Sequence, residues 1–128
     1  MKRKIFSIFF ILFAFVQARA SFIFIPMDES QTNCLKAYGI AYMALKNGIG
    51  VEWLLNYRGG SFSFPDATLF EVECKIRNVK FEIIADEQES AILAQIADPS
   101  VNMDAVKLEK PPKIAVYSPK NKMPWDDA

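Results

Sequence analysis

The sequence predicts an α/β fold in which Rossmann-like βαβ units build a mostly parallel sheet. Three observations support this prediction. Short apolar runs rich in β-branched and aromatic residues alternate along the chain with stretches of helical period. A strand–helix–strand connection is right-handed and makes its two strands parallel. The length of 128 residues suits one small domain followed by the start of a second α/β domain. A ferredoxin-like α+β fold is the alternative.

The first βαβ unit is predicted at the start of this domain. The run SFIFIPM (residues 21–27) is a short strand closed by a proline, and VEWLLNY (residues 51–57) is a second strand. Residues 28–48 lie between them and repeat apolar side chains at helical spacing. We therefore expect the two strands to be parallel neighbours.

The helix over residues 28–48 has signals at both ends. Asp28 or Ser30 can cap its start, and Asn47-Gly48 suits its end. Its apolar face, which we expect to lie in the core, consists of Cys34, Leu35, Tyr38, Ala41, Tyr42 and Leu45.

Residues 65–77 have two interpretations. The run FEVECKIR (residues 70–77) alternates apolar and charged side chains, which is typical of a strand. Pro65-Asp66, however, suits the start of a helix, and Asn78 suits a left-handed exit from one. We predict a helix followed by a strand over residues 79–86. The apolar face of this helix consists of Leu69, Val72 and Ile76.

The last part of the chain contains a helix and a boundary. Asp86 starts the helix EQESAILAQIA, and Pro99 prevents its continuation. Pro111-Pro112 is a stiff, extended joint. After it, residues 113–118 read as a fresh buried strand. We expect three parts: a leader (residues 1–20), a small α/β domain (residues 21–110), and a linker with the first strand of a truncated second domain (residues 111–128). The chain would then be the front of a longer protein.

The first twenty residues have the pattern of a signal peptide. A basic start (Lys2, Arg3, Lys4) precedes the apolar run IFSIFFILFAFV, and Ala18 and Ala20 supply the small residues that a signal peptidase reads. The run is shorter than the roughly 20 residues of a membrane-spanning helix. We expect cleavage before Ser21, export to the periplasm or the extracellular space, and no stable membrane anchor afterwards.

Composition excludes several classes of function. Four of the fifteen basic residues lie in the leader but none of the fifteen acidic ones, so the mature chain is acidic and nucleic-acid binding is disfavoured. The chain has no histidine, which removes Ser-His and Cys-His catalytic pairs and His-bearing zinc sites. Cys34 and Cys74 are too few for an all-cysteine zinc site. We expect two buried free thiols, with one disulfide as the alternative. We predict no catalytic residue, metal or cofactor.

One pattern suggests a ligand. At the carboxyl ends of the two predicted strands, Asp28, Glu29 and Gln31 would face the stretch NYRGGSF across a crevice where α/β sheets bind ligands. Glycine backbone can approach an oxyanion closely, and an arginine can pair with it. A small anionic ligand is therefore possible there. The interpretation that we prefer is a plain turn with helix capping and a structural Asp–Arg pair, and the ligand site is the alternative. The ligand candidates in NYRGGSF are Asn56, Arg58, Gly59 and Gly60.

Two stretches carry a family resemblance. QTNCLKAYGIAYMALKNGIGVEWLLNYRGGSF (residues 31–62) and PKIAVYSPKNKMPWDDA (residues 112–128) resemble the front of a bacterial exported family usually labelled asparagine synthetase B. The resemblance implies a longer protein whose downstream part is similar to class I amidotransferase-like domains. One departure is Cys34, where the family more often has a histidine.

The catalytic motifs of glutamine-dependent asparagine synthetases do not occur in this chain. Lys2 follows Met1, so no cysteine nucleophile stands at the start, and Gly59-Gly60 precedes a serine instead of following it. We therefore expect a non-catalytic N-terminal portion of the exported protein. The alternative is a small anionic-ligand-binding module that uses Asp28 and Arg58.

Overall fold

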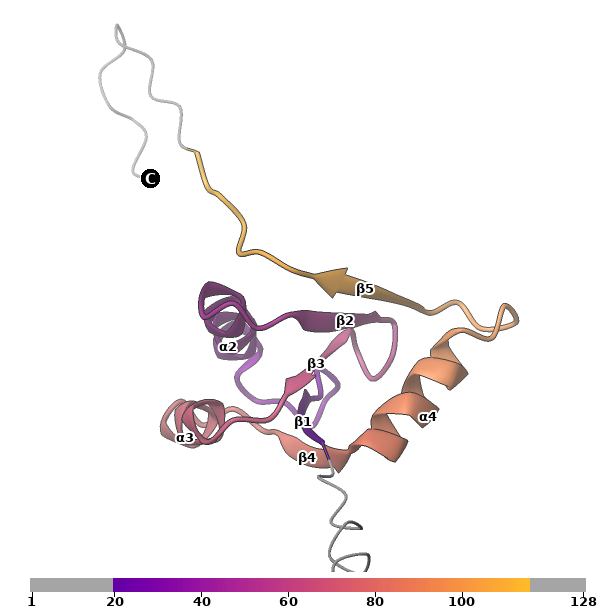
Figure 1. Ribbon diagram of the computed structural model, residues 1–128, viewed down its shortest axis with the longest axis horizontal. Helices are drawn as coiled ribbons and strands as arrows, with labels where there is room; N and C mark the ends of the chain where they lie inside the picture. The colour runs from indigo at the N-terminus through magenta and orange to yellow at the C-terminus, as the bar shows by residue number, and fades with distance from the viewer. Residues whose placement is uncertain (1–19, 116–128) are drawn as a thin grey trace, which may run out of the picture.

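The computed structural model describes residues 20–115 as a five-stranded antiparallel sheet with helices packed on both faces (Figure 1). The strand order is β4-β1-β3-β2-β5. In chain order the elements are β1 (Ser21–Ile25), α2 (Cys34–Lys46), β2 (Val51–Leu55), β3 (Ser61–Pro65), α3 (Thr68–Ile76), β4 (Glu82–Ala85), α4 (Asp86–Ile96) and β5 (Asp104–Leu108). Residues 1–19 of the predicted leader and residues 116–118 of the predicted strand over residues 113–118 lie outside the described residues, and residues 113–115 form no strand.

The predicted mostly parallel, Rossmann-like sheet is wrong. Each strand pair is antiparallel: β1 with β3 and β4, and β2 with β3 and β5. The reason lies in the short connection of residues 56–60, which turns β2 directly into β3. β3 then pairs with β1 as well, so it separates the two strands that we expected to be neighbours. β1 and β2 still run in the same direction, one strand apart.

The ferredoxin-like alternative is compatible with this fold only loosely. The elements from β1 to β4 follow the order β-α-β-β-α-β of that fold. α4 and β5 have no place in it, because β5 adds a fifth strand beside β2 and α4 covers the second face of the sheet.

The larger core lies between the sheet and the pair α2 and α3. Alternate residues of the central strands point to this face, among them Ile23, Ile25 and Phe64. Phe64 packs edge-on against Phe70 of α3, with ring centroids 5.5 Å apart. Burying a side chain of this size contributes roughly 1.5–3 kcal/mol. From α2, the core receives the small and branched residues Ala37, Ile40, Ala41, Ala44 and Leu45.

The predicted apolar face is wrong for α3 and only partly right for α2. In α2, Ala41 and Leu45 are buried as predicted, whereas Leu35, Tyr38 and Tyr42 are exposed. In α3, Phe70 and Cys74 are buried, whereas the predicted apolar face is exposed. That face consists of Leu69, Val72 and Ile76. Both helices carry apolar side chains on more than one side, so the hydrophobic period alone did not fix which side faces the sheet.

The two thiols lie in different environments. Cys74 is buried, and this burial raises its pKa to about 11. Cys34, at the first position of α2, is exposed, which corrects the prediction that both thiols are buried. Neither forms a disulfide.

The predicted start of α2 was also too early. The helix begins at Cys34, with Asn33 as its N-cap. The carboxylate of Asp28 instead accepts a hydrogen bond from the backbone N–H of Ser30, at 3.0 Å, and so closes a local turn. Asn78 does adopt the predicted left-handed conformation after α3, with φ of 54°. None of the described helices is long and apolar enough to cross a membrane.

The smaller core lies between the other face of the sheet and α4. It joins Phe24, Leu54 and Ile84 to Ile96 of α4. A glutamate is buried in the same layer: Glu89 is 4% exposed, and its Oε2 accepts a hydrogen bond of 2.8 Å from the hydroxyl of Ser63. Burial raises the pKa of Glu89, as do the nearby carboxylates of Glu52 and Asp86, while the Ser63 bond opposes the shift.

The buried carboxyl group of Glu89 should lower the stability of the fold by an amount that depends on pH. Because the pKa of Glu89 is raised in the folded state, its contribution to stability is fully present below the pKa of the unfolded chain, about 4.3, and is lost as the pH rises through the folded pKa. Glu89→Gln should therefore raise the Tm at about pH 7 and have little effect at about pH 4. Thermal unfolding across this pH range measures the difference. Glu109→Gln, which removes an exposed carboxylate, is the control and should show no such trend. An equal effect of Glu89→Gln at both pH values would contradict the assignment.

Candidate functional site

The connection between β2 and β3 is a strained turn that rests on the loop after β1. Asn56 and Arg58 have positive φ values of 62° and 43°, and the two glycines that follow have 83° and 91°. Such a conformation costs a non-glycine residue about 1–2 kcal/mol. The backbone N–H of Met27 donates to the carbonyl of Arg58 at 3.1 Å. A Cβ on Gly59 would lie 2.4 Å from the carbonyl oxygen of Met27, so only glycine fits there.

Arg58 holds two carboxylates from different parts of the chain. Its Nε donates to Oδ2 of Asp28 at 2.7 Å, and its Nη1 donates to Oε1 of Glu82 at 2.9 Å. The guanidinium carbon lies 5.3 Å from the ring centroid of Phe24. We call Asp28, Arg58 and Glu82 the Arg58 cluster. It ties the turn to the loop after β1 and to the edge strand β4.

The hydrogen bonds of the cluster shift two pKa values. The hydroxyl of Ser30 and the guanidinium of Arg58 both donate to Asp28 and lower its pKa to about 2. The same carboxylates of Asp28 and Glu82 raise the pKa of Arg58. Asp28 and Arg58 are therefore both charged at neutral pH and form an ion pair.

The other polar side chains predicted to bind a ligand lie outside the Arg58 cluster. Gln31 is buried and points away from Arg58: its amide donates to the carbonyls of Pro26 and Lys80 at 3.1 and 3.0 Å, and its oxygen accepts from the N–H of Lys80 at 3.1 Å. Asn56 donates to the carbonyl of Asn102 at 2.8 Å, which ties the turn to the loop before β5. Glu29 is exposed. The structure thus brings Asp28 and Arg58 together and leaves the remaining polar side chains outside the cluster.

A cavity of about 330 Å³ borders the cluster on the α4 side of the sheet. Its wall combines Arg58 and Glu82 with apolar side chains of the sheet and α4. An anion in this cavity would have to compete with two carboxylates for the guanidinium. Glu82 was not predicted as a site residue, because its place depends on the pairing of β4 with β1, which no local pattern indicates.

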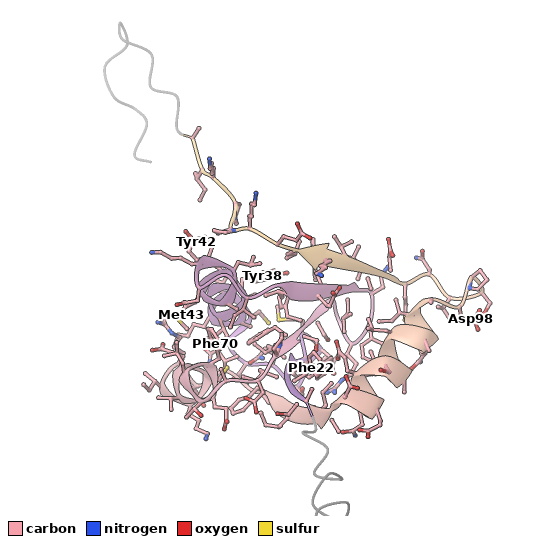
Figure 2. The ribbon with its side chains drawn as sticks, viewed as in Figure 1. Phe22, Tyr38, Tyr42, Met43, Phe70 and Asp98 are labelled. Carbon is pink, nitrogen blue, oxygen red and sulfur yellow. The ribbon has the colours of Figure 1, made fainter. Side chains whose placement is uncertain are left out.

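A second hollow lies on the opposite face of the sheet, where the chain leaves β5. We call it the β5 groove; its volume is about 320 Å³. It is lined by Tyr38, Ala41, Tyr42, Leu45, Trp53, Phe62, Leu108 and Pro112. Tyr38 and Tyr42 lie on the side of α2 next to the segment that leaves β5 (Figure 2).

Aromatic rings give the β5 groove a fixed shape. Trp53 stacks on Phe62 with centroids 6.2 Å apart, and Tyr38 meets the same phenylalanine edge-on at 5.3 Å. The indole N–H of Trp53 is buried and has no hydrogen-bond partner within residues 20–115. The sequence contained one sign of the groove, namely the number of apolar side chains on α2, two of which (Tyr38 and Tyr42) we had assigned to the core. α2 has more apolar side chains than one face of the sheet can cover.

Comparisons give no further direction. No family model, curated protein or solved structure matches this chain. Within the described residues, no group of three or more histidine, cysteine, aspartate or glutamate side chains is placed to hold a metal ion.

The close approach at Gly59 predicts a large difference between two similar substitutions. Gly48, after α2, also has a positive φ, 78°, but a Cβ there would meet nothing within 4 Å. Gly48→Ala should therefore cost about 1–2 kcal/mol, from the backbone conformation alone. Gly59→Ala must in addition push apart two backbone segments, and should cost roughly 3 kcal/mol or more. Denaturant unfolding of both variants measures the two costs. Equal costs would show that the turn does not depend on this contact.

Proposed function

We propose that this chain is the N-terminal, non-catalytic portion of an exported protein similar to the family labelled asparagine synthetase B. In this proposal residues 20–115 bind the downstream part of the protein, which docks in the β5 groove. The resemblance of residues 31–62 and 112–128 supports the family, and the leader pattern supports export to the periplasm or the extracellular space. By the same resemblance, the downstream part is amidotransferase-like.

The observation that carries this proposal is the position of the β5 groove. Pro112 itself lines the groove, four residues after the end of β5. Ile114, which follows, is 87% exposed. An apolar groove with aromatic walls thus opens beside the point where the chain leaves the sheet. Large exposed apolar surfaces of this kind mark sites of association.

The chain's own continuation is the occupant that these positions favour. Because Pro112 already lies in the groove wall, the residues after it are tethered at the site, and tethering gives them an effective concentration in the millimolar range. A second copy of the protein has no such advantage. The tethered sequence also supplies apolar and aromatic side chains that suit the groove: Ile114, Val116, Tyr117, Met123 and Trp125.

The Arg58 cluster has a structural role in this proposal. Its guanidinium and two carboxylates join three segments that are distant in sequence, and a set of three charges with these hydrogen bonds needs no ligand to be satisfied.

Docking of the continuation can be tested by proteolysis of the full chain. Trypsin cuts at Lys120 and Lys122, which follow the groove in sequence. Tyr42→Glu, which places a charge in the half-exposed groove wall, should raise the cleavage rate at these sites at least about tenfold, equivalent to about 1.4 kcal/mol. Val72→Glu is the matched control, because Val72 is equally exposed on α3 but lies outside the groove. It should leave the rate unchanged.

Two results would count against the proposal. Equal cleavage rates in wild type and both variants would exclude docking in the groove. A native protein, isolated intact from the cell envelope, whose mass equals that of residues 21–128 would exclude a longer chain.

A small anionic ligand at Arg58 is the second candidate, because the guanidinium borders the cavity of about 330 Å³. A ligand at 100 times its Kd adds about 2.7 kcal/mol of stability. Carboxylates and phosphates should then raise the Tm of the wild type but not of Arg58→Ala, and Glu82→Gln should enlarge the shift by removing a competing carboxylate. Lys75→Ala, at another cation paired with a carboxylate, is the control. Equal shifts in wild type and Arg58→Ala, or none in either, would leave NYRGGSF as a turn.

A further inference from the structure

Asp66, directly after β3, has one carboxylate oxygen with a partner and one without. Its backbone N–H donates to the carbonyl of Ser21 at 2.9 Å, and its Oδ2 accepts from the hydroxyl of Ser21 at 3.0 Å. Its Oδ1 is buried and has no hydrogen-bond partner in the part of the chain that the structure describes. A buried carboxylate oxygen without a partner is costly and rare in folded proteins, so it requires an explanation.

The unpaired oxygen lies beside the bond at which the leader is expected to be removed. Ser21 is the first residue of β1, and the predicted cleavage point is the Ala20–Ser21 peptide bond. Hydrolysis by a signal peptidase consumes one water. The carbonyl carbon of Ala20 gains the hydroxyl and becomes a carboxylate on the released leader, and the nitrogen of Ser21 gains a hydrogen. The resulting amine takes up a proton below its ordinary pKa of about 7.7–8.0.

We propose that Asp66 is the binding site for the α-ammonium group that this cleavage creates on Ser21. The nitrogen and the hydroxyl of a serine are separated by only two carbon atoms, and the hydroxyl of Ser21 already contacts one oxygen of Asp66. Before cleavage the nitrogen is a neutral amide with one hydrogen. After it, the nitrogen carries a positive charge and three donors, which match the unpaired Oδ1.

The other neighbouring strand also ends beside the new terminus. β4 pairs with β1, and Asp86 follows it directly; its backbone N–H donates to the carbonyl of Ala20 at 3.2 Å. Cleavage removes that carbonyl. The new ammonium thus lies where two strand ends meet, each followed by an aspartate, with Asp66 on one side and Asp86 on the other.

In this proposal, removal of the leader supplies the ion-pair partner of Asp66. Within residues 20–115 the half-buried carboxylate of Asp66 has no cation beside it; after cleavage, the new terminus supplies one. The inference rests on the proposed export, because it requires a mature protein that begins at Ser21. The site itself can be tested on a recombinant chain that is made to start there, so a failure of the site and a failure of export give different results.

The test compares the Tm of three chains that differ only at the start. The first begins with a free amine at Ser21, the second carries an acetylated Ser21, and the third retains Ala20, which moves the ammonium by one residue. The first should unfold at a temperature higher by roughly 4 °C or more than the other two. Because pairing raises the pKa of the amine in the folded state, this advantage should be present below about pH 7.7 and be lost as the pH rises further.

Asp66→Asn identifies the partner. It keeps an acceptor for the Ser21 hydroxyl but removes the charge, so it should abolish the difference between the free and the acetylated chain. Glu109→Gln, an exposed charge change, should preserve the difference. Equal Tm values for the first three chains, or an unchanged difference in Asp66→Asn, would overturn the proposal.

A direct measurement covers the case in which Asp66→Asn does not fold. The pKa of the Ser21 amine in the otherwise unaltered mature chain can be followed by NMR. A value above the ordinary range supports the site, and a value within or below that range overturns it. N-terminal sequencing of the native protein from the cell envelope separately tests whether processing creates this end; a different first residue would refute the maturation step without bearing on the affinity of Asp66 for an ammonium.

Discussion

The contact between the backbone of Gly59 and that of Met27 determines where the central strand of the sheet begins. The turn of residues 56–60 can rest on the loop after β1 only because no side chain separates the two segments. β3 then starts beside the end of β1 and pairs with it over four residue positions. The carbonyl of Arg58 is fixed by Met27, so its side chain extends toward Asp28 and Glu82. Sheet order, the turn conformation and the charged cluster all depend on this one approach.

Local sequence patterns predicted the kinds of elements but not their arrangement. Alternation and helical period indicated β1, β2, α3, β4 and α4 near their observed positions, because these patterns reflect the side-chain geometry within one element. The neighbour of each strand is decided by contacts between distant residues, and the sequence carried no local sign that β3 would insert between β1 and β2. β5 was missed because its alternation is weak: Asp104 and Lys107 are exposed in a strand at the edge of the sheet.

The candidate sites were likewise predicted only where they depend on local sequence and not on strand pairing. Asp28, Arg58 and the glycines were predicted because their residue types and their places at strand ends are visible in the sequence. Glu82 and the β5 groove were not, since each requires two elements whose pairing was unknown. In α2, Tyr38 and Tyr42 were assigned to the core because helical spacing puts them on one face with Ala41 and Leu45. Ala37 and Ala44 lie in the core beside Ala41 instead, since small residues allow the helix to approach the sheet closely.

The two apolar layers of the protein are unequal, and this has a consequence for motion. Among the residues that the structure describes, the layer under α4 has four buried apolar side chains against thirteen in the other layer, and a buried glutamate lies among the four. Segments with few buried apolar contacts open in partial unfolding events while the rest of the protein stays folded, and their amide hydrogens exchange with solvent early. α4 closes this layer, so we expect its amide hydrogens to exchange earlier than those of α2. The β5 groove is built on the other layer, and β5 is paired with β2, so an opening of α4 alone leaves the groove in place.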